Sequence, residues 1–312
     1  MKRSGGRNIW RLARIGISAG LLLWLFSRFD LKGLGTSLGE LNLWMWIAAF
    51  FMMLTAQVLS SIRWWILSKA CAFPGRWLNY LGFYFVGMFF NLFLPTGIGG
   101  DFFKIHFLSR EEGRRIVAAS TVVSDRFFGL VAMLLIGAVA VHLKSYPLPE
   151  PLRLFLTLSG LGLLGVMAFM PVMENLIRRF WPTVAPYLEI ISIIRRNPLR
   201  LVSLFALSFC LQGMGIAAVA VLGTGMGIFL PTAIYFVIVP LVALSTLLPI
   251  SFNGIGVREG AFVYLLGLHG IDAGKALGLG LIFFSVQVAI SLIGGIAYTT
   301  GAHRWKGGVN RV

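Results

Sequence analysis

The sequence predicts an all-α polytopic membrane protein, with about six full spans and two re-entrant helical hairpins in an inverted-topology repeat. Three observations predict this class. Of the 312 residues, 58% are hydrophobic and only 12% are charged, whereas about a quarter of a soluble chain is charged. Several apolar runs approach the ~20 residues that cross a bilayer as a helix. Two further apolar runs are interrupted by the same order of Leu-Pro and Gly-Ile-Gly.

Six apolar runs are expected to cross the membrane. The first follows a basic N-terminus and is expected to stay attached, because no small-residue cleavage site follows it. A first repeat (1–150) and a second repeat (151–312) are expected, and within the second a linker at 171–198, rich in Pro and Arg, is expected to lie on the membrane surface. The expected spans are Ile15–Phe26, Leu41–Leu67, Ile116–Leu143, Leu152–Met170, Leu199–Leu222 and Ala276–Thr300.

The two interrupted runs are expected to form hairpins, near 77–110 and near 229–268. The first break reads LFLPTGIGGDFFK and the second reads LLPISFNGIGVREGAF. Irregular backbone at membrane depth persists only where it is buried in protein or lines a cavity. The segment Val257–Leu268 after the second break has 12 residues, about 18 Å of helix, which is too short to span ~30 Å of hydrocarbon. Broken segments at matching positions of two halves indicate a transporter site.

The distribution of Lys and Arg favours the two-hairpin arrangement. With both hairpins re-entrant, nineteen of the 27 cations face the inside and six face the outside, while Arg63 and Arg126 lie within spans. If only the first arm of the first hairpin crossed the membrane, the Lys and Arg residues would divide almost evenly between the two sides. The positive-inside rule therefore predicts a multi-pass plasma-membrane protein with both termini in the cytoplasm. The net charge of +16 is interpreted as span-flanking cations that attract anionic lipid, and no nucleic acid partner is expected.

Ionisable residues within apolar segments are the candidate functional residues, because buried charge is costly in hydrocarbon. Arg126 and Arg258 are expected to make bidentate contacts to a lipid phosphate, with the acids tuning selectivity or coupling. One alternative is internal salt bridges that only hold helices together, and another is that Arg63 and Lys104 snorkel to the interface. The set comprises Arg63, Asp101, Lys104, Asp125, Arg126, Arg258 and Glu259.

The residues of the two breaks form the second part of the candidate site. Helices that restart after the glycines are expected to point backbone N–H groups at an anionic group. The alternative is a glycine turn needed only for close helix packing. No cofactor is expected: the GIGG run lacks the Gly-Lys-Ser/Thr of a P-loop, and the Cys and His residues lack metal-ligand spacing. The break residues are Pro95, Gly97, Gly99, Gly100, Pro249, Asn253, Gly254 and Gly256.

The chain resembles the flippase-like transmembrane domain of the lysylphosphatidylglycerol synthase superfamily, over roughly residues 10–300. The resemblance implies translocation of an anionic, aminoacylated or glycosylated lipid between leaflets. The synthases also carry a C-terminal aminoacyltransferase domain, and this chain ends twelve residues after Thr300, so it is expected not to make lysyl-lipid itself. The matching motifs are Arg63-Trp64, Leu94-Pro95 with Gly97-Ile-Gly99-Gly100-Asp101, Asp125-Arg126 with Gly129, and Leu248-Pro249 with Gly254-Ile-Gly256-Val-Arg258-Glu259.

The expected function is therefore that of an integral membrane lipid flippase or transporter, and not that of an enzyme. Anionic membrane lipids are the expected partners, and a lipid-modifying synthase and a homo-oligomer are left open. One alternative is a membrane-embedded transferase acting on a lipid, for which Asp101 and Glu259 are the carboxylate candidates. The other is a membrane anchor for a soluble lipid-modifying enzyme.

Overall fold

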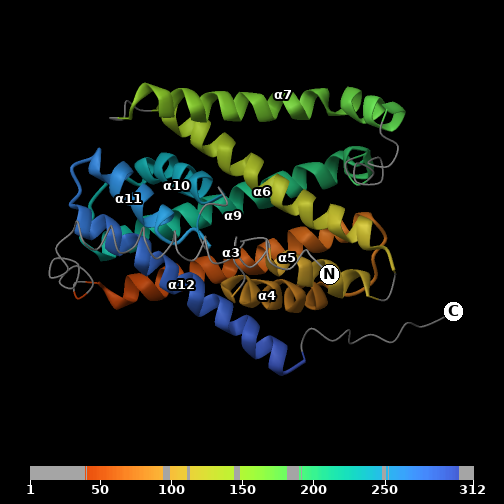
Figure 1. Ribbon diagram of the computed structural model, residues 1–312, viewed down its shortest axis with the longest axis horizontal. Helices are drawn as coiled ribbons and strands as arrows, with labels where there is room; N and C mark the ends of the chain where they lie inside the picture. Colours follow the sequence, from red (N-terminus) through yellow and green to blue (C-terminus); the bar gives the residue numbers. More distant parts are fainter. Residues whose placement is uncertain are drawn as a thin grey trace, which may run out of the picture.

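The computed structural model describes residues 39, 41–93, 99–110, 113–143, 148–180, 190, 192–247, 251 and 253–301, and its regular secondary structure there is entirely helical. Figure 1 shows a bundle of helices with one long helix, α7, along its side. The expected first span, Ile15–Phe26, lies outside the described residues. The helices are α3 (Leu43–Ala70), α4 (Trp77–Phe93), α5 (Gly99–Ser109), α6 (Arg115–Leu143), α7 (Glu150–Phe180), α9 (Pro198–Gly225), α10 (Thr232–Leu247), α11 (Val257–Gly267) and α12 (Ala273–Thr299).

Five of these helices, α3, α6, α7, α9 and α12, are long and apolar enough to cross a membrane. Each coincides with one of the expected spans, so the prediction of a multi-pass helical membrane protein is supported. Three of them begin where a side-chain oxygen accepts a hydrogen bond from the first turn: Asn42 caps α3, Asn197 caps α9 and Asp272 caps α12. Such caps satisfy backbone N–H groups that have no partner within the helix.

The helices on either side of each break have the expected bounds and pack in pairs, α4 on α5 and α10 on α11. The second helix of each pair has 11 residues, which is about 17 Å and half the thickness of the hydrocarbon layer. Asn253, Gly254 and Gly256, which lead into α11, all have positive φ angles. Since such angles strain residues with a Cβ, glycine suits two of these three positions.

One boundary differs from the prediction. The segment 171–198 was expected to form a separate surface linker, but α7 continues through Pro171 to Phe180. A proline removes one intrahelical hydrogen bond, and in membrane helices local adjustments and neighbouring groups can compensate for that loss. Pro171 is therefore not a sufficient signal for the end of this helix.

The helix packing is unchanged when the two halves are exchanged, with α3, α4, α5 and α6 corresponding to α9, α10, α11 and α12. Helices α3 and α9 pack against each other, α4 packs on α12, and α10 packs on α6. Likewise α5 packs on α6, and α11 packs on α12. Each pair of short helices therefore contacts the final helix of both halves.

Two groups of buried apolar side chains form the core. The larger group joins α3, α4, α6, α7, α9, α10, α11 and α12, and the smaller one surrounds Trp64 and Tyr80 where α3, α4, α5, α6 and α9 meet. Glycine allows the closest helix approaches. Gly294 of α12 lies so near the backbone carbonyl of Phe85 on α4 that a Cβ at this position would overlap it. These contacts hold the helices around a polar cavity at the centre.

Candidate functional site

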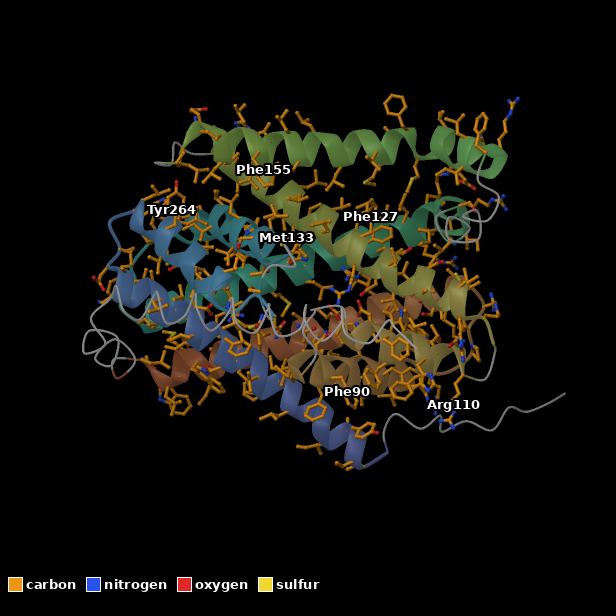
Figure 2. All side chains as sticks on the ribbon, in the orientation of Figure 1. Phe90, Arg110, Phe127, Met133, Phe155 and Tyr264 are labelled. Carbon is orange, nitrogen blue, oxygen red and sulfur yellow. The ribbon has the colours of Figure 1, made fainter. Side chains whose placement is uncertain are left out.

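A cavity of about 740 Å³ lies among helices of both halves, with walls from α3, α4, α5, α6, α9, α10 and α12. Met133 and Phe127, labelled in Figure 2, contribute apolar parts of its wall from α6. Polar side chains inside an apolar helix bundle cost free energy unless they bond to one another or to a ligand. Their concentration here therefore marks the candidate site. The polar wall consists of Gln57, Ser60, Arg63, Tyr84, Asn91, Lys104, Asp125, Arg126, Gln212 and Gln287.

The first charged pair of the cavity joins α3 to α6. The Nε of Arg63 donates to Oδ1 of Asp125 at 2.7 Å, and an Nη1 hydrogen bond of 2.8 Å reaches the hydroxyl of Ser208 on α9. Both charged residues are buried. Arg63 therefore does not snorkel to an interface. Its charge is balanced by Asp125, and the pair fixes three helices around the cavity.

A second charged group brings α5 and α6 together. The buried carboxylate of Asp101, at the third residue of α5, accepts a hydrogen bond from Nε of Arg126. The Nζ of Lys104 lies 3.5 Å from the other carboxylate oxygen and 3.6 Å from the ring centre of Tyr84, a cation–π contact. Lys104 is buried, so it does not snorkel to the interface either.

The sum of these formal charges is positive. Arg63 and Asp125 cancel, and the two cations Lys104 and Arg126 share the single carboxylate of Asp101. The Arg126 side chain keeps 44% of its surface exposed and faces the cavity. The adjacent acid Asp125 pairs with Arg63 and not with Arg126, as expected for neighbours that point in different directions on a helix. Among the residues that the structure describes, these groups leave one excess positive charge at the cavity, which suits an anionic ligand.

The second break forms its own closed ion pair. Arg258 donates from Nη2 and Nε to Oε1 of Glu259 at 2.6 and 2.9 Å, and from Nη1 to the amide oxygen of Gln287 on α12 at 3.3 Å. Its guanidinium also lies 4.7 Å from the ring centre of Phe284. Arg258 is buried and does not line the cavity, whereas Gln287 does. In this conformation the guanidinium of Arg258 is engaged by Glu259 and Gln287, so its expected contact with a phosphate stays a prediction.

The helix N-termini after the glycines also differ from the expectation. The N–H of Gly100 donates to Oδ1 of Asn91 at 2.5 Å, and the N–H of Gly256 donates to Oε2 of Glu259 at 2.6 Å. Side chains of the protein thus occupy donors that were expected to face an anion. Gly100 instead lies against the backbone of Gly87 on α4, so its lack of a side chain serves close packing. Gly99 begins α5, and Pro95, Gly97 and Pro249 lie outside the described residues.

Several uncharged residues of the cavity were not found from the sequence. Gln57, Ser60 and Arg63 follow one another at three-residue spacing along α3, and Gln212 follows Ser208 by one turn on α9. Gln212 donates to the carbonyl of Gly129 at 2.9 Å. The available signal was the helical spacing of these polar residues from a charged one within a span. Among the described residues, no group of three or more His, Cys, Asp or Glu could hold a metal ion.

Apolar membrane-length helices around a charged internal cavity define an integral membrane protein with a polar site inside the bundle. The family model of the lysylphosphatidylglycerol synthase TM region matches residues 11–295, and the chain belongs to this family. No curated protein matches the chain significantly. The family is consistent with a lipid-related function in a membrane.

Proposed function

We propose that this protein moves a lipid with an anionic head group between the leaflets of the plasma membrane. The observation that carries the proposal is an excess of one formal positive charge, counted over the described residues, at a cavity within an apolar bundle. The phosphate of the lipid binds the guanidinium of Arg126, which faces the cavity and forms charge-assisted hydrogen bonds with anionic oxygens. Lys104 adds a point charge next to it.

The remaining polar wall suits the rest of a head group. Gln57, Asn91, Gln212 and Gln287 present amides to the cavity, and such groups can bind hydroxyls or a glycosyl unit without adding charge. The proposal therefore covers anionic lipids whose phosphate is anchored at Arg126 and whose further substituents face the amides.

The exchange symmetry of the helix packing supports movement by alternating access. Asp101 and Glu259 are each the third residue of a short helix after a break, and each holds an arginine. In this conformation Arg126 is exposed to the cavity, while Arg258 is sealed by Glu259 and Gln287. In an inverted repeat the two halves exchange these roles, which opens the cavity first to one leaflet and then to the other. Both termini lie in the cytoplasm in this proposal.

Native mass spectrometry of the lipids that the purified protein retains tests the head-group site. Wild type is compared with Arg126→Ala and with Arg153→Ala, a matched control that removes an arginine from an ion pair with Glu150 outside the cavity. The expected result is one anionic lipid class enriched over the bulk membrane extract on wild type and Arg153→Ala, and lost on Arg126→Ala. Identical profiles that match the extract would contradict the site and favour the enzyme or anchor alternatives.

A further inference from the structure

The cavity shares two wall residues with a second, apolar space along α6. A groove of about 290 Å³ lies between α6, α7 and the start of α9, and its lining includes Ser124, Phe128, Met167 and Met170. Val123 and Phe127 of α6 line both this groove and the charged cavity. These two residues are four apart and share one face of the helix. They therefore form the boundary between the polar and apolar spaces.

The positions of Val123 and Arg126 relate the two spaces to one ligand. They are three residues apart on α6, so they are neighbours on the helix surface. Val123 is 64% exposed and lines both spaces, while Arg126 lines the charged cavity. A molecule that binds Arg126 through an anionic group and continues past Val123 enters an apolar groove. Lipids have this chemistry, with a phosphate joined through glycerol to hydrocarbon.

Helix α7 forms the outer wall of the groove and is attached to the bundle through α6. Near its start, Leu156 packs on Gly137 and Gly160 lies against Ala138 of α6. Figure 1 shows the two helices diverging from there, and the groove lies in the diverging part. Its lining also includes Arg195, whose Nη2 lies 3.8 Å from Oε2 of Glu174 on α7. The wall of this otherwise apolar groove thus carries one ion pair.

We infer that an acyl chain of the lipid held at Arg126 lies in this groove between α6 and α7, and that Val123 and Phe127 form the passage to it. The inference rests on the proposed function and adds the place of the hydrocarbon. Lipid tails surrounding the protein are as apolar as the groove, so the groove gives little affinity. Its contribution is to keep the chain beside the bundle while the head group is inside.

Photo-crosslinking tests this assignment directly. The purified full-length protein, in nanodiscs containing phosphatidylglycerol with a diazirine in one acyl chain, is irradiated and its adducts are located by mass spectrometry. Adducts at Met167 and Met170 are expected to exceed those at Phe169, which is 65% exposed on the other face of α7 and serves as the control for bulk lipid. Arg126→Ala is expected to reduce the Met167 and Met170 adducts to the level at Phe169.

A matched pair of variants tests the passage. Val123→Trp fills the boundary and is expected to remove the excess at Met167 and to slow phosphatidylglycerol flipping in liposomes by about tenfold. Val139→Trp is the control, because Val139 also lies on α6 with 60% of its surface exposed but does not line the groove. It is expected to leave both readouts at the wild-type level.

The outcomes separate this inference from the proposed function. Equal adducts at Met167, Met170 and Phe169 in wild type, with anionic lipid still selectively retained, would overturn the groove assignment alone. An excess of adducts at Met167 and Met170 that persists in Arg126→Ala would also overturn the groove assignment. The acyl chain in the groove would then belong to a lipid that the cavity does not hold. If native mass spectrometry found that wild type retains no anionic lipid selectively, the proposed function would be overturned.

Discussion

The carboxylate of Asp101 on α5 is buried and binds the guanidinium of Arg126 on α6, whose side chain remains 44% exposed. The same carboxylate lies 3.5 Å from the ammonium of Lys104. One acid therefore serves two cations at the wall of the cavity. This shared contact joins the first short-helix pair to the last helix of its half, and it leaves the cavity with a surplus positive charge.

Replacing Asp101 with Asn should strengthen anion binding. The substitution keeps the size of the side chain but raises the formal charge of the cavity by one unit. Two charges about 4 Å apart near a protein surface interact by a few kcal/mol, so retention of phosphatidylglycerol should rise by roughly tenfold, or about 1.4 kcal/mol. Titration of the lipid in native mass spectrometry measures this affinity. Weaker binding in Asp101→Asn would show that the acid itself contacts the ligand favourably.

Arg63 should prove structural. Arg63→Ala leaves the buried Asp125 without its main partner, and loss of one member of a buried pair typically costs about 3–5 kcal/mol. The double variant Arg63→Met/Asp125→Leu removes both charges and should recover most of the lost stability. Unfolding of the two variants in mild detergent measures the difference. A double variant no more stable than Arg63→Ala would contradict the pairing.

Gly100 should tolerate no side chain. A Cβ at this position would overlap the backbone of Gly87 and lie 2.9 Å from Cγ of Asn91. Gly100→Ala should therefore destabilise the α4–α5 pair by about 1–3 kcal/mol, seen as a lower melting temperature. Gly162→Ala on α7 is the control, because a Cβ there meets nothing within 4 Å. Equal melting temperatures for the two variants would argue against the close approach of α4 and α5.

Glu259 should hold the start of α11. Its carboxylate accepts from the N–H of Gly256 and binds Arg258. Glu259→Gln leaves a buried cation without a countercharge, so α11 should open more often, and amide hydrogen exchange should rise in Val257–Gly267 while α3 stays protected. Unchanged exchange in α11 would show that Gln287 and Phe284 suffice to hold Arg258.

The sequence located the charged residues of the site because charge inside apolar segments is rare and costly. It did not give their partners. The two ion pairs depend on how α3, α5 and α6 cross, and no local pattern encodes that geometry. They join Asp101 to Arg126 and Asp125 to Arg63. The amides of Gln57, Gln212 and Gln287 were missed because an uncharged polar residue in a span carries a weaker penalty. The helix starts at Gly99 and Val257 agree with the predicted restarts after the two breaks, since Gly acts locally on the backbone.

The expected role of Arg258 illustrates the same limit. The second break matches the first only in part, because here the base Arg258 and the acid Glu259 are adjacent in the sequence. Neighbouring side chains rarely meet on a regular helix, but at the first turn of α11 the Arg258 guanidinium folds back onto Glu259. The sequence predicted a charged residue at this position. The geometry of the helix start then pairs the charge of Arg258 with that of Glu259.

The rate of phosphatidylglycerol flipping in proteoliposomes tests the central claim most directly. Wild type and Arg153→Ala should transfer a labelled lipid between leaflets at equal rates, and Arg126→Ala should fall to the rate of protein-free liposomes while remaining folded. Wild-type flipping by a folded Arg126→Ala protein would contradict the account, because the cavity would then move lipid without its exposed cation.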